Sequence, residues 1–398
     1  MVIRPLAWTA PARASVPASI GLDEAADAVL LSGSKEGSPR YPKTWATPST
    51  QYAVAIHRPL VGQNGLVFQV ADRKIQAVDL RSGEEKFSIP VDSASSPALL
   101  GDRVVCQERG ALFVYDPATR REVWRQPMGG SWGRQPLVTP NGNVIAGQSA
   151  SLVAFDGDTG KELWSTGTGS EVSPLAHTQG VILATCGIYA GETTRLLAFD
   201  SAGTQIWSKS YDRQVSVADG PVYYLKEKMF KLLGTSHSLR AVDPKTGRKL
   251  WSESADASTD LFAVPGGVVV RDGRQLRMRE AQTGRQLWSY QINGECGWNG
   301  PFSNVQATEK GLIVTHPDGQ ITGLDPATGK ELWNEPSRGP SHHGPAVGPD
   351  GVLVLKTEGT LKGLIPRELV AIAGQPRPGI SEGESSVQVG NVQLKKRR

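Results

Sequence analysis

The sequence predicts an all-β protein, an eight-bladed β-propeller with a non-repeating extension at each end. The first observation is a motif that recurs along the chain at a spacing of roughly 37–45 residues. The second is a short apolar run before each copy of the motif, and the third is the tryptophan that closes most copies. Four strands of about five residues with their turns fill this spacing, which is the size of a propeller blade. The length of 398 residues is therefore interpreted as one ring of repeats rather than as several domains.

Seven full copies of the motif align with one another. They are AVDLRSGEEKF (77–87), VYDPATRREVW (114–124), AFDGDTGKELW (154–164), AFDSAGTQIW (198–207), AVDPKTGRKLW (241–251), REAQTGRQLW (279–288) and GLDPATGKELW (323–333). Six copies end in a tryptophan, at Trp124, Trp164, Trp207, Trp251, Trp288 and Trp333, and Phe87 takes that place in the first copy. Each copy is expected to be a hairpin of two strands.

The turn inside the motif has the composition of a β-hairpin turn. An aspartate at its start accepts hydrogen bonds from the backbone of the residues that follow, and a proline, as in Asp116-Pro117, presets φ for the next position. A glycine, as at Gly160, Gly247 and Gly329, supplies the left-handed residue that joins the two strands.

An eighth copy is incomplete. The apolar run GVLVL (351–355) precedes GTLKGLIP (359–366), which has Ile365 in place of the aspartate and no closing tryptophan. The missing outer strand is supplied either by TWATPSTQYAVAI (44–56) or by ELVAIAG (368–374). We favour the N-terminal segment, because closure across the two termini leaves no exposed sheet edge.

The pattern hydrophobic–Asp–x–x–Thr–Gly–Lys–Glu–Leu–Trp resembles the repeat of the pyrroloquinoline-quinone-like (PQQ-like) propeller family. AFDGDTGKELW and GLDPATGKELW match this repeat almost residue for residue, and the resemblance covers roughly residues 56–366. It implies an eight-bladed propeller in which each motif tryptophan packs between adjacent blades. The six tryptophans of the motif are therefore expected to be structural.

The family includes quinoprotein dehydrogenases and outer-membrane assembly lipoproteins. The dehydrogenases imply a quinone in the central channel, stacked on a tryptophan above Ca²⁺, often against a disulfide between adjacent cysteines. This chain has no Cys-Cys dipeptide and no acidic cluster that stands out as a calcium site. It also has none of the GxSxG, Walker-type or HExxH patterns. We therefore expect no cofactor, no bound metal and no catalytic residue.

Strand order separates the two faces of a propeller. In an antiparallel blade with strands A to D, the B–C turns and the D–A connections share one face, whereas the repetitive C–D turns lie on the other. The irregular connections MGGSWGRQP (128–136), NGECGWNGPF (293–302) and SRGPSHHGP (337–345) therefore lie on one face. The partner-binding residues predicted on this face are Trp132, Arg134, Trp298, His342 and His343. An alternative role for Trp132 and Trp298 is to plug the central channel or to pack between blades.

The segment KEKMFKLL (226–233) mixes basic and apolar residues at near-helical spacing. Two interpretations are open for it, a docking segment for a partner or a membrane surface, and a short insertion packed on its own blade.

The ends lie outside the repeat. Residues 1–43 are predicted to be an N-terminal extension with one short helix at 21–31, residues 44–374 the propeller, and residues 375–398 a linker and tail. The valines and leucine of SVQVGNVQL alternate around Gly390-Asn391, which is typical of a small hairpin or of one strand that adds to another sheet. The final Lys395, Lys396, Arg397 and Arg398 are predicted to contact an acidic surface.

The net charge of +4 belongs to that tail, because the rest of the chain has 39 basic and 39 acidic residues. A neutral body does not predict a large nucleic-acid footprint, and no apolar run is long enough for a transmembrane segment. The amino terminus has no continuous apolar core of signal-peptide length, and the three cysteines are widely spaced. We therefore expect a cytoplasmic protein with free thiols.

Taken together, these observations predict a non-catalytic scaffold that binds a protein partner in a bacterial assembly or signalling system. The alternative function is a ligand-binding or quinoprotein-type enzymatic propeller that uses the central channel.

Overall fold

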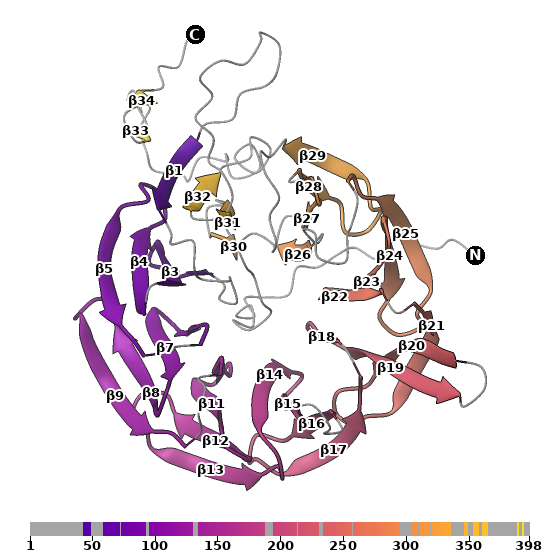
Figure 1. The fold of residues 1–398 in the computed structure, drawn as a ribbon, viewed down its shortest axis with the longest axis horizontal. Coiled ribbons are helices and arrows are strands. Elements are labelled where there is room, and N and C mark those ends of the chain that lie inside the picture. Colours follow the sequence, from indigo (N-terminus) through magenta and orange to yellow (C-terminus); the bar gives the residue numbers. More distant parts are fainter. Residues whose placement is uncertain are drawn as a thin grey trace, which may run out of the picture.

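The computed structural model describes residues 43–48, 59–71, 73–92, 95–129, 134–187, 194–212, 214–230, 234–256, 258–294, 304–308, 311–318, 320–335, 346–348, 353–357, 360–364, 388–389 and 392–393. Every regular element in this part of the chain is a β-strand, and the strands form eight four-stranded antiparallel sheets and one two-stranded sheet. The four-stranded sheets stand side by side in a ring, with strands such as β18, β22, β26 and β30 nearest the centre (Figure 1). The expected all-β propeller is confirmed. No helix among the described residues is long and apolar enough to cross a lipid bilayer.

Seven of these sheets, called blades 1 to 7 here, follow one another along the chain. Blades 1 to 3 consist of β2 (Leu60–Val61), β3 (Leu66–Ala71), β4 (Lys74–Asp79) and β5 (Glu85–Pro90); β6 (Ala98–Leu100), β7 (Arg103–Glu108), β8 (Ala111–Asp116) and β9 (Arg121–Pro127); and β10 (Leu137–Val138), β11 (Asn143–Gln148), β12 (Ser151–Asp156) and β13 (Glu162–Gly167). Blades 4 and 5 consist of β14 (Val172–Thr178), β15 (Val181–Cys186), β16 (Arg195–Phe199) and β17 (Gln205–Ser210); and β18 (Val215–Val217), β19 (Val222–Phe230), β20 (Gly234–Val242) and β21 (Lys249–Ala255). Blades 6 and 7 consist of β22 (Asp260–Val264), β23 (Gly267–Asp272), β24 (Gln275–Glu280) and β25 (Gln286–Gln291); and β26 (Asn304–Thr308), β27 (Gly311–Thr315), β28 (Ile321–Leu324) and β29 (Glu331–Glu335).

The remaining four-stranded sheet, called the closing blade, is built from both ends of the chain. Its order is β1 (Lys43–Pro48), β32 (Thr360–Leu364), β31 (Leu353–Thr357) and β30 (Ala346–Val347). The N-terminal alternative for the outer strand is therefore confirmed by the pairing of β1 with β32. The inner strand β30 also contacts β2 of blade 1, so the first and last sheets are neighbours in the ring (Figure 1).

Strand register shows which residue of the closing blade takes the place of the motif tryptophan that the eighth copy lacks. In blade 3, Trp164 lies opposite Ala154, and a bulge follows at once in the ladder. In blade 7, Trp333 lies opposite Gly323, again next to a bulge. In the closing blade, Trp45 of β1 lies opposite Gly363, and the register shifts between Lys43 and Trp45. Trp45 therefore stands at the register position of the missing eighth tryptophan.

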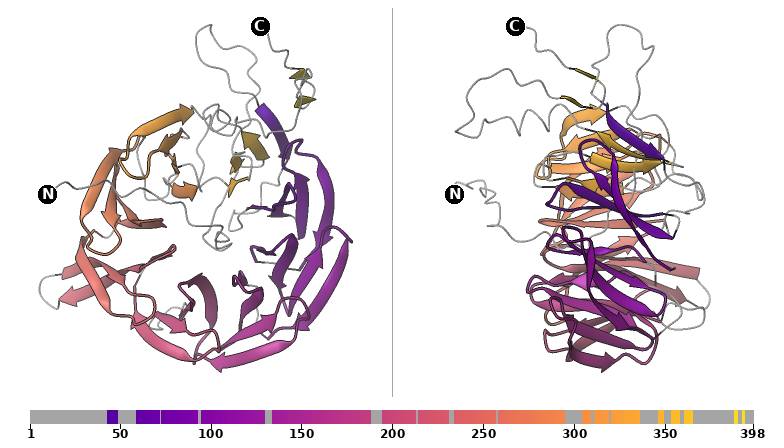
Figure 2. Two further views of the ribbon diagram at one scale, coloured as in Figure 1. Left: turned by 180° about the vertical axis from the view of Figure 1, so that it is seen from behind. Right: turned by 90° about the vertical axis from the view of Figure 1, so that its left-hand side faces the viewer.

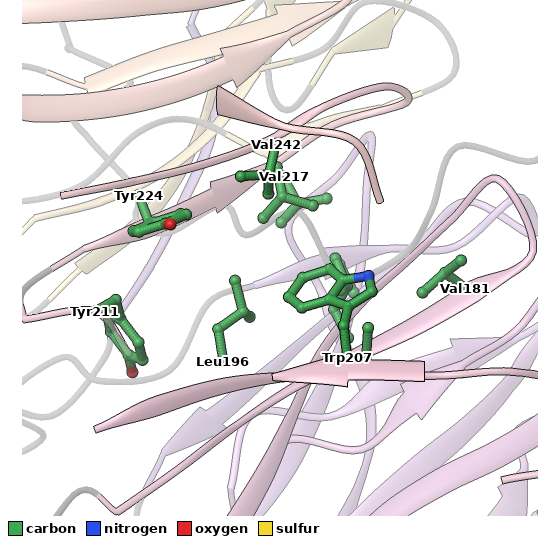
Figure 3. Close-up of a cluster of buried hydrophobic side chains, with 11 residues drawn as sticks. Val181, Leu196, Trp207, Tyr211, Val217, Tyr224 and Val242 are labelled. Carbon is green, nitrogen blue, oxygen red and sulfur yellow. The ribbon is translucent and has the colours of Figure 1, made fainter. Parts of the chain in front are cut away.

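The hydrophobic core is divided into clusters that lie between successive blades. Between blades 4 and 5, for example, Leu196, Trp207, Val217 and Val242 belong to one buried cluster (Figure 3). Neighbouring blades cover both faces of a sheet, and so the second and third strands are buried over most of their length, as in β7 and β8.

The motif tryptophans join each blade to the next one along the chain. Trp207 on β17 is 8% exposed, and its Nε1 donates a hydrogen bond of 2.8 Å to the carbonyl of Pro244 in the turn of blade 5. The indole lies on Gly247, where an added Cβ would come within 2.8 Å of Trp207 Cγ. Gly247 also has a φ of 65°. Other residues are therefore excluded here both by the contact with Trp207 and by the left-handed backbone conformation.

The same contact recurs around the ring. The other pairs are Trp124 with Gly160, Trp164 with Gly203, Trp251 with Gly284 and Trp288 with Gly329. In each pair the indole N–H donates to a carbonyl of the same turn, at Gly157, Ser201, Ala281 and Pro326 respectively. The repeated motif is thus a joint between two blades as well as a hairpin.

The prediction of near-helical character for KEKMFKLL is wrong for its described residues. Lys226 to Phe230 continue β19, and β19 pairs with β20 over its full length as a long hairpin that projects beyond the rim (Figure 1). Asp212 fixes the base of this extension, because its carboxylate accepts a hydrogen bond of 2.6 Å from the Glu227 N–H and binds Lys226 Nζ at 3.1 Å. The backbone donors of the segment have partners in β20, which a helix would have to replace.

At the C-terminal end, β33 (Gln388–Val389) and β34 (Val392–Gln393) pair antiparallel, which confirms the small hairpin around Gly390-Asn391. The helix predicted at 21–31 lies outside the described residues.

We expect Trp207→Ala to lower the free energy of unfolding by about 3–5 kcal/mol, because it removes a buried aromatic side chain and the hydrogen bond to Pro244. Denaturation by urea checks this value. The matched control is Leu163→Ala, since Leu163 is an outer-strand residue that is 46% exposed, and its effect should stay within about 0.5 kcal/mol. Equal effects of the two substitutions would contradict the joint between blades.

Two truncations test the role of β1. Removal of residues 1–48 should lower the thermal midpoint substantially more than removal of residues 1–42, because only the longer deletion takes away the strand that pairs with β32. Differential scanning calorimetry of both variants and of the full chain gives the comparison. Identical midpoints for the two truncated chains would show that β1 does not close the ring.

Candidate functional site

The two faces of the ring differ in construction, as the edge-on view in Figure 2 illustrates. The turns between third and fourth strands, which carry the motif, lie on one face, called the turn face. The turns between second and third strands lie on the opposite face with the connections from each blade to the next, and we call this the connection face. The last residues of each connection immediately precede the innermost strand of the next blade, so they lie at the inner edge of the ring.

Of the five residues predicted for a partner-binding face, only Arg134 is described. It lies on the connection face, between β9 and β10. Trp132, Trp298, His342 and His343 lie outside the described residues, as do the four basic residues of the tail, 395–398. Their roles stay predictions.

Arg134 contacts both the connection that precedes its own in the chain and the connection that follows it. Its guanidinium forms an ion pair with the carboxylate of Glu171, which lies just before β14. The side chains of Arg134 and Glu171 are only 15% and 21% exposed. The Arg134 carbonyl accepts a hydrogen bond of 2.8 Å from Ser95 Oγ, which lies between β5 and β6. Three successive connections are thus tied together at the inner edge of the ring.

A buried amide lies beside this group. The Nε2 of Gln107, on β7, donates a hydrogen bond of 2.9 Å to the carbonyl of Gly147. An added Cβ on Gly147 would come within 2.0 Å of the Val172 carbonyl oxygen and 3.5 Å of Arg134 Cδ, so only glycine permits this packing. Gln107 is 2% exposed, and its Oε1 accepts no hydrogen bond from the described residues.

A buried acceptor without a donor is costly, by about 1–3 kcal/mol, so a water or ligand hydroxyl near Gln107 would be favourable. Neither Gln107 nor Glu171 was predicted as a site residue from the sequence. The available signal was a polar residue at the end of an otherwise apolar strand, VVCQ (104–107). That signal is weak, because the equivalent Gln69 of blade 1 bonds within its own blade, to Gln76.

A second polar cluster joins blades 6 and 7 on the same face. His316, fully buried, accepts a hydrogen bond of 2.9 Å at Nδ1 from the Asn293 N–H. Its Nε2 lies 2.9 Å from Thr322 Oγ1, so the tautomer that satisfies both contacts carries its proton on Nε2. Burial lowers the pKa of His316, and the carboxylates of Asp318 and Glu331 oppose this shift. His316 is therefore uncharged, and its hydrogen bond with Asn293 connects the two blades.

The described residues do not fit a calcium–quinone centre. They contain no group of three or more His, Cys, Asp or Glu side chains that could hold a metal ion. The described cysteines, Cys106 and Cys186, are buried free thiols in different blades, and burial raises the pKa of Cys106, so this thiol stays protonated. The part of the chain that the structure describes thus supplies neither the metal ligands nor the disulfide implied by the quinoproteins.

The fold and its repeat define the class of protein, a β-propeller with PQQ-like repeats. A family model described as "Outer membrane protein assembly factor BamB" matches residues 42–127, 108–260 and 235–372. The chain belongs to this family.

Three curated relatives are similar to parts of the chain. The 1-butanol dehydrogenase (cytochrome c) of Thauera butanivorans is 40% identical over 74 residues, which are 18% of this chain and 11% of the relative. The polyvinylalcohol dehydrogenase of a Sphingopyxis species is 24% identical over 294 residues, 63% of this chain and 45% of the relative. The outer membrane protein assembly factor BamB of Nitrosomonas eutropha is 27% identical over 204 residues, 50% of this chain and 38% of the relative. Each match spans less than half of the relative's length.

Solved structures share the fold. BamB from Moraxella catarrhalis aligns with a TM-score of 0.55 and 16% identity, over 82% of this chain and 100% of that one. The quinohemoprotein alcohol dehydrogenase from Comamonas testosteroni aligns with a TM-score of 0.55 and 14% identity, over 87% of this chain and 78% of that one.

These comparisons overturn the predictions of a non-catalytic scaffold and of a protein that is not an enzyme. Two curated relatives are dehydrogenases, and their similarity to this chain supports the alternative function. The prediction failed for a physical reason. The repeat specifies how the blades join, and a dehydrogenase needs the same joints as an assembly factor. The absence of hydrolase and nucleotide motifs therefore does not exclude redox chemistry on the connection face.

Acidification should destabilise the protein through His316. Its pKa in the folded chain lies below the ordinary value of 6.5, so as the pH falls through about 6.5 the unfolded chain takes up a proton that the folded chain does not. Stability is therefore lost as the pH decreases from about 7.5 to about 5.5. Urea denaturation across this interval should show a steeper loss for the wild type than for His316→Asn, whose amide oxygen can still accept from the Asn293 N–H. Parallel curves would contradict a buried neutral His316.

Proposed function

We propose that the chain is an alcohol-binding propeller related to the quinoprotein-type dehydrogenases, and that the alcohol binds at the inner edge of the connection face. The observation that carries this proposal is the polar group made by Arg134, Glu171 and Gln107. It combines an ion pair at the inner edge of the ring with a buried amide oxygen that lacks a donor among the described residues.

An alcohol suits this chemistry because its hydroxyl group both donates and accepts hydrogen bonds. The hydroxyl can donate to a carboxylate or amide oxygen while it accepts from a guanidinium. The dehydrogenase relatives are named for 1-butanol and polyvinyl alcohol, which supports the same class of ligand. Oxidation of an alcohol to a carbonyl compound also needs an electron acceptor. The described residues do not fit calcium and quinone, so the acceptor of the electrons is left to the assay below.

We also propose that the ring has eight blades. The support comes from the eight four-stranded sheets among the described residues and from the place of Trp45 in the register of the closing blade. The family model begins to match at residue 42, directly before β1, which supports β1 as a strand of the ring.

A dye-linked dehydrogenase assay tests the proposed function. Purified full-length protein is given 1-butanol or polyvinyl alcohol with an artificial electron acceptor, both as isolated and after incubation with pyrroloquinoline quinone and Ca²⁺. We expect alcohol-dependent reduction of the dye in at least one arm. Arg134→Met should reduce the rate at least about tenfold, because an ionic hydrogen-bond donor is lost from the site.

The matched control is Arg103→Met, which removes an arginine of similar pairing from the turn face, where Arg103 binds Asp158 at 2.7 Å. This variant should keep the wild-type rate. The absence of alcohol-dependent reduction in both arms, together with no alcohol-induced change in thermal midpoint, would overturn the proposal. Equal loss of rate in the two arginine variants would move the site away from Arg134.

A further inference from the structure

A polar cavity of about 210 Å³ lies at the junction of blades 5 and 6, away from the inner edge of the ring. Its walls come from the end of the outer strand β21 and from β23 and β24 of blade 6. The polar side chains that line it are Glu253, Ser254, Asp256, Asp272, Arg277 and Arg279. The hydroxyl of Thr259, another lining residue, is buried and accepts a hydrogen bond of 3.0 Å from the Asp256 N–H. The cavity opens at the end of β21, on the connection face.

The two arginines differ in how many of their donors are used. Arg279 forms a bidentate ion pair with Glu253, in which its Nε and Nη2 lie 3.1 and 2.7 Å from the two carboxylate oxygens. Arg277 makes a single contact of 2.6 Å from Nη2 to Asp272 Oδ2. The Nε of Arg277 is buried without an acceptor among the described residues. Arg277 is therefore less fully paired than Arg279, and its side chain is 28% exposed, so the accessible part of its guanidinium can donate to a ligand in the cavity.

The formal charge of the lining limits the class of ligand. Two guanidinium groups face three carboxylates, because Asp256 adds an exposed negative charge to the two that are paired. A phosphate group would meet an excess of negative charge, although phosphate sites need an excess of positive charge. A metal ion has no ligand group here, since no cluster of three or more His, Cys, Asp or Glu among the described residues could hold one. A purely apolar ligand would leave the charged groups desolvated.

We propose that this cavity binds a neutral polyhydroxylated ligand, a sugar alcohol or a sugar. Adjacent hydroxyl groups can donate to Asp256 and Asp272 while they accept from Arg277, which no ligand with only donors or only acceptors can do. Ala255 and Val270 contribute a small apolar wall for the C–H side of such a molecule. The volume of about 210 Å³ leaves room for a small polyhydroxylated molecule. This site is separate from the alcohol site at the inner edge and does not depend on it.

Titration of the full-length protein with sorbitol tests the proposal. Binding is followed by isothermal titration calorimetry and by saturation-transfer NMR, with inorganic phosphate and spermidine as comparison ligands. We expect saturable binding of sorbitol in the millimolar range or tighter, and neither phosphate nor spermidine should displace it. Arg277→Gln and Asp256→Asn should each weaken binding about tenfold, because each removes one charged hydrogen-bond partner.

The control variant is Arg73→Gln, which breaks an exposed ion pair with Asp92 far along the ring from blade 5 and should leave sorbitol affinity unchanged. Asp256 is exposed, so Asp256→Asn keeps the test valid even where Arg277→Gln fails to fold. The proposal is overturned by an absence of saturable sorbitol binding, by wild-type affinity in Asp256→Asn, or by displacement of sorbitol with phosphate or spermidine.

Discussion

The contact between a motif tryptophan and the glycine of the next turn is the interaction on which the ring depends. It couples neighbouring blades through one indole ring and one hydrogen bond to a turn carbonyl, and it is seen from Trp124 with Gly160 to Trp288 with Gly329. The two partners of a joint lie in successive repeats, and the tryptophan–glycine joint is described at the five junctions from blade 2 to blade 7. Because this joint is local and recurs from blade to blade, the connections on the opposite face can differ without loss of the ring.

That division between the two faces accounts for the distribution of polar groups. The turn face is occupied by short hydrogen-bonded turns in which an aspartate such as Asp156 accepts from the backbone and hydroxyl of Thr159, which lowers the pKa of Asp156. The connection face instead carries the partly buried pair of Arg134 with Glu171 and the buried His316. Groups of this kind cost stability unless they are satisfied, and they gather where the repeat does not specify the sequence.

The sequence was sufficient for the parts of the fold that repeat. Periodicity, turn chemistry and the closing tryptophans located the hairpins and indicated β1 as the outer strand of the closing blade. It was insufficient where a contact depends on residues far apart in the chain. The approach of Gly147 to Val172 and the pairing of Arg134 with Glu171 arise only when neighbouring blades have assembled, and no local pattern signals them. The prediction for the segment from Lys226 to Phe230 was wrong for a related reason. Pairing with strand β20 determines the conformation of this segment, although the spacing of its apolar residues is near-helical.

The pairing of β1 with β32 has a consequence for biosynthesis. Strand β1 is synthesised before every other strand of the ring, and its partner β32 after all of them, so the ring stays open until β32 has been made. Until the ring closes, β1 and the outer edge of β32 are both unpaired. An unpaired edge readily accepts a strand from another chain. Closure between the two ends is therefore the slow, long-range step of assembly, and a nascent chain that stalls before residue 360 has blades but no finished ring.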